Sequence, residues 1–307
     1  MQHDVIIACD FKSAADTFGF LDLFRGEERK PFLKIGMELF YAEGPAIVRE
    51  IKRRGHKIFL DLKLHDIPNT VRKAMAVLSR LDVDMCNVHA AGTIEMMKAA
   101  REGLTREDGT RPLLIAVTQL TSTSEERMQR ELLIGAPIGE TIVQYARNAR
   151  EAGLDGVVCS PLEAGMVHGA CGAEFLTVTP GVRFADGDVA DQVRVTTPAR
   201  ARATGAGFIV VGRPITAAAD PVAAYRRCVA EFGGWPPRRP DGRRRPAPRR
   251  PGGAGRTAGD GCGGAVGALH VRFGVRRGRR IGRRRTEFAR QSRNCRIFAG
   301  AHPCATA

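Results

Sequence analysis

The chain has 307 residues, of which 43% are hydrophobic, and a formal net charge of +15 at pH 7. The hydrophobic fraction is sufficient for a core, which excludes a wholly disordered chain, and the absence of any run of about 18 apolar residues excludes a membrane-spanning helix. The N-terminus lacks the basic segment of a secretory signal, and the eight cysteines form no C-x-x-C pair and no zinc-type spacing, so we expect a cytoplasmic protein with reduced thiols.

Eight short apolar segments recur along the first 232 residues, separated by stretches with helical periodicity. Near-continuous apolar character is typical of strands that are buried on both faces of a parallel sheet. In chain order, the expected strands are residues 5–9, 32–35, 58–62, 85–88, 113–117, 156–159, 175–178 and 208–211. Between them, apolar residues at helical spacing predict helices over 42–54, 70–81, 138–152 and 221–232.

This alternation predicts a (β/α)8 barrel, an α/β fold, because eight βα units in about 230 residues match the compact end of that architecture. The alternative is a doubly wound open sheet, which has the same local pattern. A dinucleotide-binding version of that sheet is disfavoured, since no G-x-G-x-x-G follows the first strand. In a barrel the chemistry lies at the carboxyl ends of the strands, so the polar residues there form the candidate site.

Charged side chains lie at the ends of the first three predicted strands. Asp10 follows the first strand, and Lys34 lies in the second. Asp61 and Lys63 both belong to the third, and residues two apart on a strand point to the same face, so we expect them to lie side by side. A structural salt-bridge network is one interpretation. We favour chemistry in which a lysine stabilises a developing carbanion and then protonates it.

The loops after the seventh and eighth strands have the composition of a phosphate site. One contains Gly181 and Arg183, and the other contains Gly212 and Arg213. Glycine permits close approach of the backbone, and arginine supplies a charged donor. Either loop alone could be a tight turn, but the two together, where barrels commonly bind phosphate, favour a phosphorylated ligand.

Residues 233–307 differ from the rest of the chain and carry its positive charge. They contain 19 Arg, no Lys and three acidic residues, a net charge of +16, whereas residues 1–232 sum to −1. This Arg-, Gly- and Pro-rich composition predicts a disordered extension after a folded domain over 1–232. The extension could bind nucleic acid or other polyanions nonspecifically, or it could have no function, as a shifted reading frame would also produce. We favour the second, because a basic run alone is a weak motif.

Six motifs occur in order along residues 4–232. The longest is FLDLKLHDIPNTV over 59–71, and the others are KIGMELF (34–40), NVHAAG (87–92), VTQLTS (117–122), VTPGVR (178–183) and VVGRPIT (210–216). Together they resemble the bacterial form of orotidine 5′-phosphate decarboxylase. The resemblance implies a (β/α)8 carboxy-lyase that converts orotidine 5′-phosphate to UMP and CO2 in the last step of de novo UMP synthesis, with no cofactor and no metal.

The resemblance also implies roles for individual residues. Lys63 would protonate C6 of the pyrimidine, Asp61 would lie beside the leaving carboxylate, and Lys34 would be its partner near the ribose. The remaining substrate contacts would be Asp10 at the ribose hydroxyls, Thr121 at the pyrimidine edge, and Arg183, Gln192, Gly212 and Arg213 at the phosphate.

A homodimer is a further implication of the resemblance. Asp66 would reach into the active site of the second subunit, with Ile67 and Thr70 near that interface. His65 alternates away from Asp61 and Lys63, which predicts packing or hydrogen bonding behind the barrel rather than general-base chemistry.

Two other functions remain as alternatives. A sugar-phosphate decarboxylase or aldolase on the same barrel would share the Asp-x-Lys-x-x-Asp strand but would use a divalent metal, and sensitivity to a chelator would distinguish it. Thr121 and the 212–216 segment favour the nucleotide enzyme instead. A nucleic-acid-binding protein acting through residues 233–307, with the barrel as a scaffold, is the alternative from another class.

Overall fold

The computed structural model describes residues 3–186 and 196–233. Within these ranges, parallel strands pair in sequence order and close into a barrel through the pairing of β1 with β8. The strands are β1 (Asp4–Ala8), β2 (Phe32–Gly36), β3 (Lys57–Leu64), β4 (Met85–His89), β5 (Leu113–Val117), β6 (Gly156–Val158), β7 (Leu176–Thr179) and β8 (Phe208–Val211). Closure confirms the predicted (β/α)8 barrel and excludes the open sheet.

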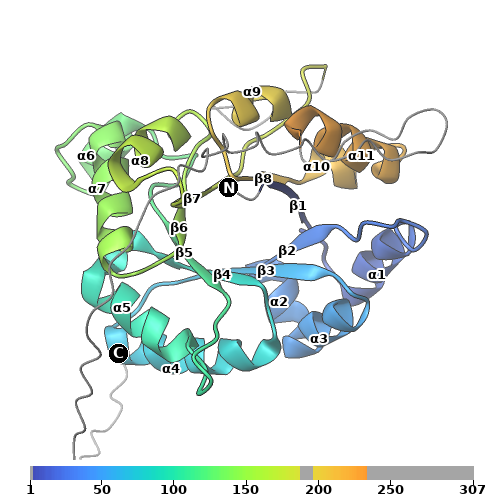
Figure 1. Cartoon of the computed structure of the whole chain (residues 1–307), viewed down its shortest axis with the longest axis horizontal. Coiled ribbons are helices and arrows are strands. Elements are labelled where there is room, and N and C mark those ends of the chain that lie inside the picture. Colours follow the sequence, from blue (N-terminus) through green and yellow to red (C-terminus); the bar gives the residue numbers. More distant parts are fainter. Residues whose placement is uncertain (1–2, 187–195, 234–307) are drawn as a thin grey trace, which may run out of the picture. The chain divides into compact units, whose positions relative to one another are not determined.

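Helices lie around the outside of the ring of strands (Figure 1). They are α1 (Ala14–Asp22), α2 (Met37–Glu43), α3 (Pro45–Arg53), α4 (Pro68–Leu78), α5 (Thr93–Leu104), α6 (Glu125–Glu131), α7 (Ile138–Glu151), α8 (Ala164–Cys171), α9 (Pro198–Ala203), α10 (Arg213–Thr216) and α11 (Pro221–Phe232), with short 3-10 turns at Ser79–Leu81 and Ala90–Gly92. The helix predicted over 42–54 corresponds to α3, except that residues 42–43 form the end of α2. Gly44, with φ +63°, ends α2 and precedes Pro45 of α3.

The core has two layers that follow the alternation of side chains along the strands. One cluster consists of strand residues only and fills the barrel interior: Ile6, Ala8, Phe32, Phe59, Met85, Ile115, Val178, Phe208 and Val210. The intervening strand residues, such as Ile7, Leu33 and Leu60, belong to the larger cluster between the strands and the helices. The inward positions beyond the interior cluster, toward the carboxyl ends of the strands, are therefore the ones that can form a site.

Close packing of α4 against α5 depends on Gly103. A Cβ at this position would lie 2.0 Å from the backbone oxygen of Arg72, which cannot move without shifting α4. We expect Gly103→Ala to lower the free energy of unfolding by about 3 kcal/mol, the upper range for overpacking. Gly169→Ala in α8 is the matched control, since its Cβ would meet nothing within 4 Å. The control should gain about 0.5–1 kcal/mol from helix propensity. Urea unfolding of both variants checks the sign, and equal stabilities would contradict the prediction.

The boundary of the predicted domain lies close to the end of the described residues. The last helix, α11, ends at Phe232, and Gly233 follows it in the left-handed conformation that is typical of helix ends. Beyond Gly233, the predicted extension lies outside the described residues, so the division at residue 232 stays a prediction. No helix in ranges 3–186 and 196–233 is long and apolar enough to span a membrane.

Candidate active site

Four charged side chains meet at the carboxyl ends of β1, β2 and β3. The Nζ atom of Lys34 lies 2.9 Å from Oδ1 of Asp10 and 3.4 Å from Oδ2 of Asp61. The Nζ atom of Lys63 lies 2.7 Å from Oδ1 of Asp61. The order along the array is therefore carboxylate, ammonium, carboxylate, ammonium, and each inner group has an opposite charge on both sides.

Because the inner side chains of this array are largely buried, the charge of each depends on its oppositely charged neighbours. The Asp61 side chain is only 9% exposed and that of Lys34 12%, whereas Asp10, at one end of the array, is 60% exposed. Burial alone would raise the pKa of Asp61, but the ammonium groups of Lys34 and Lys63 outweigh it and hold that pKa below its usual value. Burial would likewise lower the pKa of Lys34, and the carboxylates of Asp61 and Asp10 raise it instead. Both inner groups, Lys34 and Asp61, are therefore charged at neutral pH.

Lys63 reaches Asp61 through an irregularity in β3 and not through simple alternation. Leu60 pairs with Cys86 and Leu64 pairs with Val88, so β3 advances four residues where β4 advances two. Lys63 lies in this bulge with φ +51°, a left-handed conformation that costs a residue other than glycine roughly 1 kcal/mol. The predicted proximity of the two side chains is confirmed, and both residues lie in β3 as predicted, but the strand contains a bulge that simple alternation does not include.

Two residues of the site were not singled out from the sequence. Asn87 of β4 is 1% exposed and hydrogen bonds to both Asp61 and the backbone of Lys63. The sequence feature that could have identified Asn87 is its polar side chain at an inward position of an otherwise apolar strand. Gly36 pairs with Asp61, and a Cβ there would lie 3.2 Å from Nζ of Lys34 and 3.3 Å from Oδ1 of Asp10. The missing side chain leaves room for that ion pair.

The residues predicted to bind phosphate follow β7 and β8, which are neighbours in the barrel. Gly181 has φ +80°, a conformation that favours glycine, and Arg183 two residues later is half-buried. Gly212 precedes α10, and Arg213 begins it with an exposed side chain. Thr121, predicted at the pyrimidine edge, lies in the turn after β5 and is half-buried. Gln192 lies outside the described residues. The roles of these residues therefore stay predictions.

The segment between β3 and α4 is exposed. Asp66 accepts a hydrogen bond from the N–H of Ile67 at 2.7 Å, and the side chain of Ile67 is 66% exposed. Thr70, in the first turn of α4, is also exposed. Residues 66–70 thus present a carboxylate, a large apolar side chain and a hydroxyl to the outside of this subunit.

The two histidines near the array lie against each other. The ring centroids of His65 and His89 are 5.6 Å apart. His65 is exposed at this edge, which differs from its predicted position behind the barrel. Burial lowers the pKa of His89, and the positive charges of His65 and Lys63 lower it further. A neutral His89 therefore adds no charge to the array at neutral pH.

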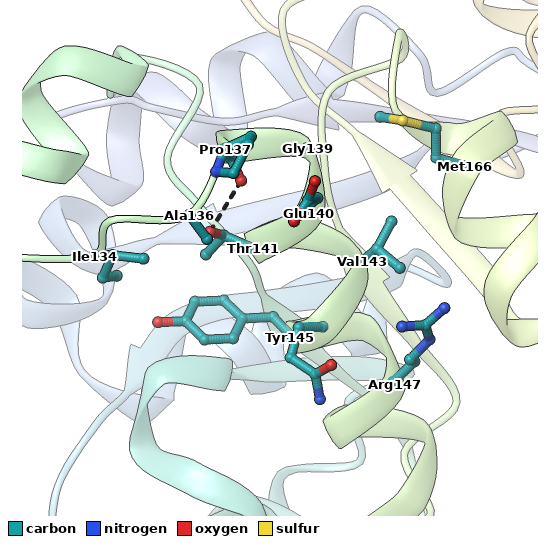
Figure 2. Close-up of a pocket in the computed structure, with 11 residues that line it drawn as sticks. Ile134, Ala136, Pro137, Gly139, Glu140, Thr141, Val143, Tyr145, Arg147 and Met166 are labelled. Atoms are coloured by element: carbon teal, nitrogen blue, oxygen red, sulfur yellow. Dashed lines mark hydrogen bonds between the residues drawn. The ribbon is translucent and has the colours of Figure 1, made fainter.

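A separate hollow lies on the outside of the barrel over α7 (Figure 2). Ile134 and Tyr145 border it, and Met166 of α8 lies at its edge. The described residues that line it come from α7, the segment before α7 and α8, and include none of the predicted site residues. Within the described ranges, no group of three or more His, Cys, Asp or Glu side chains could hold a metal ion.

A closed βα barrel with a partly buried lysine–carboxylate array at the carboxyl ends of its strands defines a barrel enzyme suited to acid–base chemistry at a developing negative charge. Comparison with known proteins narrows this class. Residues 3–228 match the family model described as the orotidine 5′-phosphate decarboxylase / HUMPS family. The chain belongs to this family, and its named relatives are carboxy-lyases.

The similarity extends over nearly the full length of the relatives. The chain is 56% identical over 237 residues to the orotidine 5′-phosphate decarboxylase of Bacillus cereus (strain AH820), an alignment that covers 76% of this chain and 99% of that protein. Among solved structures, the orotidine 5′-phosphate decarboxylase of Lactobacillus acidophilus matches with a TM-score of 0.68 and 40% identity over 75% of this chain and 99% of that one. An uncharacterized conserved protein from Geobacillus kaustophilus matches with a TM-score of 0.66 and 50% identity, covering 74% and 99%.

Proposed function

We propose that Lys63 is the proton donor in the decarboxylation of orotidine 5′-phosphate to UMP and CO2, the reaction that this chain catalyses as a member of its family. The bond between C6 and the carboxylate breaks, CO2 leaves, and the electron pair stays on C6. The Lys63 ammonium stabilises that pair and then transfers a proton to C6. The neutral amine regains its proton from solvent, which closes the cycle.

The observation that carries this proposal is the alternating array itself. Oδ1 of Asp61 lies 2.7 Å from Nζ of Lys63 and holds that amine in position through an ion pair. Lys34, held between Asp10 and Asp61, fixes Asp61 from the other side. The donor is therefore oriented before substrate arrives, so little reorganisation is needed at the transition state. A substrate carboxylate placed next to Asp61 would also experience repulsion that its departure relieves.

The remaining contacts would hold parts of the substrate that do not react. We place the ribose at Asp10, the pyrimidine edge at Thr121, and the phosphate at Arg183, Gly212 and Arg213, with Gln192 as a further phosphate contact from the sequence. The adjacency of β7, β8 and β1 supports this order, because it brings the two glycine–arginine loops next to the strand that carries Asp10. Binding energy at the phosphate could then lower the barrier at C6.

The test is turnover of orotidine 5′-phosphate by the full chain, followed by the loss of its pyrimidine absorbance, with and without EDTA. Equal and rapid rates are expected, since the proposed chemistry needs only side chains. Turnover that EDTA abolishes would contradict the cofactor-free mechanism. No turnover of the nucleotide, with metal-dependent turnover of a sugar phosphate instead, would favour the alternative activity within the same family.

We further propose that the protein acts as a homodimer in which Asp66 completes the site of the partner subunit. The exposure of Asp66, Ile67 and Thr70 at the mouth of the barrel supports an interface there. Lys63→Ala and Asp66→Ala should each be nearly inactive, but a mixture allowed to exchange subunits should recover about a quarter of the wild-type rate, because half of the dimers regain one intact site of two. A mixture as inactive as its components would refute the shared site.

The folded domain over 1–232 is proposed as the whole catalytic unit, in the cytoplasm. The five cysteines of the described part are buried and free, as is usual in a reducing compartment. A chain ending at residue 232 should match the full chain in kcat and KM for orotidine 5′-phosphate, with weaker binding of heparin at low salt. A large loss of kcat on truncation would instead assign a catalytic role to residues 233–307.

A further inference from the structure

We infer that Asn87 is a positioning residue for the decarboxylation: its side-chain amide joins the Asp61 carboxylate to the backbone of Lys63 and sets the geometry of that pair. Asn87 lies in β4, two positions before His89, and its side chain faces the barrel interior with 1% exposure. The inference rests on the proposed role of Lys63 and extends it to a side chain that need not touch the substrate.

Both the nitrogen and the oxygen of the Asn87 side-chain amide form hydrogen bonds. The Nδ2 group donates to Oδ1 of Asp61 at 2.7 Å, and Oδ1 accepts the N–H of Lys63 at 2.8 Å. The two partners fix the orientation of the amide, because an ionised carboxylate can only accept and a backbone N–H can only donate. Asn87 thus links the carboxylate of Asp61 to the backbone of Lys63, the proposed proton donor.

The β3 bulge explains why a side chain is needed here. Between the Leu60–Cys86 and Leu64–Val88 pairs the register of β3 and β4 slips, and the Lys63 N–H bonds to the Asn87 side chain where a regular ladder would offer a backbone oxygen. The same bond supports the left-handed conformation of Lys63, at φ +51°. Without it, a partly buried N–H would lose its acceptor and the bulge would lose the contact that holds it.

Lys63 Nζ and Asn87 Nδ2 bond to the same oxygen of Asp61. The amide hydrogen bond restricts rotation of the carboxylate, so that the other oxygen stays directed at Lys34. The charged and titratable groups around Asp61 are Lys34 from β2, Lys63 from β3 and His89 from β4, with Asp10 beyond Lys34. Asn87 is the neutral member of this shell.

The first test replaces Asn87 with leucine, which is similar in volume and makes neither bond. We expect kcat for orotidine 5′-phosphate to fall about 10²-fold, as for a reacting group displaced by about 1 Å, with KM changed less than about threefold. The matched control is Thr177→Val, because Thr177 of β7 is also fully buried and accepts the N–H of Gly207 at 3.0 Å. The control should lose comparable thermal stability and keep the wild-type kcat.

A second variant tests the donor half alone. Asn87→Asp keeps an acceptor for the Lys63 N–H but places a second carboxylate against Asp61. Its kcat should be low at pH 8 and should recover relative to wild type as the pH falls, because a proton shared by the two carboxylates restores a donor. A merely structural role for Asn87 would leave the two pH profiles parallel.

The outcomes separate this inference from the proposed function. Wild-type and Thr177→Val enzymes that fail to decarboxylate orotidine 5′-phosphate would overturn the function itself. Active controls together with a fully active Asn87→Leu, or with a parallel pH profile for Asn87→Asp, would overturn the inference alone. If Asn87→Leu does not fold, as judged by circular dichroism and UMP binding, the Asp variant decides.

Discussion

Replacing Lys63 with alanine is expected to lower kcat for orotidine 5′-phosphate by at least about 10⁴-fold, because the variant loses both a general acid and a preorganised charge at the reacting carbon. KM should change far less, since the contacts proposed for the phosphate and ribose lie on other strands. The same substitution leaves Asp61 with Lys34 and Asn87 as partners, so the fold should persist. Single-turnover absorbance measurements at high enzyme concentration give the residual rate.

Lys63→Arg separates the two roles of this residue. Arginine keeps a positive charge beside Asp61 but does not lose its proton near neutral pH. We expect an activity between alanine and wild type if charge stabilisation contributes independently of proton transfer. Melting temperatures of both variants close to that of the wild type would show that the loss is chemical. A kcat within tenfold of the wild type for Lys63→Ala would contradict the assignment of the proton donor.

The barrel could be predicted because its strands are buried on both faces. That burial produces apolar segments such as 113–117 and 208–211, which a sequence displays directly. The location of the site followed from the same topology, because parallel strands bring their carboxyl ends to one edge. Asp10, Lys34, Asp61 and Lys63 could therefore be grouped although up to 53 positions separate them, as their numbers in the sequence show.

The details that depend on pairing between strands could not be predicted. The bulge at Lys63 arises from a slip of β3 against β4, and neither strand alone displays it. The role of Asn87 depends on that shift in register. Its polar character alone therefore does not distinguish a residue that positions Asp61 and Lys63 from a buried amide with a purely structural role. Gly36 matters because a Cβ there would crowd the side chains of Lys34, on the same strand, and of Asp10, which follows the neighbouring strand β1. The break at Gly44 was locally visible as a Gly–Pro pair, but helical periodicity on both sides concealed it.

Asp61→Asn should destabilise the protein in a manner that depends on pH. The pKa of Asp61 is lowered in the folded state, because the charges of Lys34 and Lys63 outweigh burial. A lowered carboxyl pKa contributes stability that is fully present above the unfolded value of about 3.9 and is lost as the pH falls below it. The wild type should therefore be more stable than Asp61→Asn by about 3 kcal/mol at pH 7, as for a broken buried ion pair, and the difference should shrink below about pH 4.

Lys34 should make the free energy of unfolding depend on pH in the alkaline range as well. Its raised pKa contributes stability that is present below its unfolded value of about 10.4 and is lost as the pH rises through the higher folded value. Because Asp61 is one of the two carboxylates responsible, Asp61→Asn should remove part of that contribution as well. The stability difference between wild type and variant should thus be largest between the acid and alkaline limits, and urea unfolding from pH 3 to pH 11 measures it.

The matched control is Glu126→Gln. Glu126 pairs with Arg130 one turn along α6, and its side chain is 81% exposed, so solvent screens the pair. That variant should follow the wild-type stability at every pH. Asp61→Asn should also lose at least about 10²-fold in kcat, because Lys63 loses the group that orients it. A variant that is as stable as the wild type at pH 7, or whose deficit does not change toward pH 3, would show that the array is held by something other than the charge of Asp61.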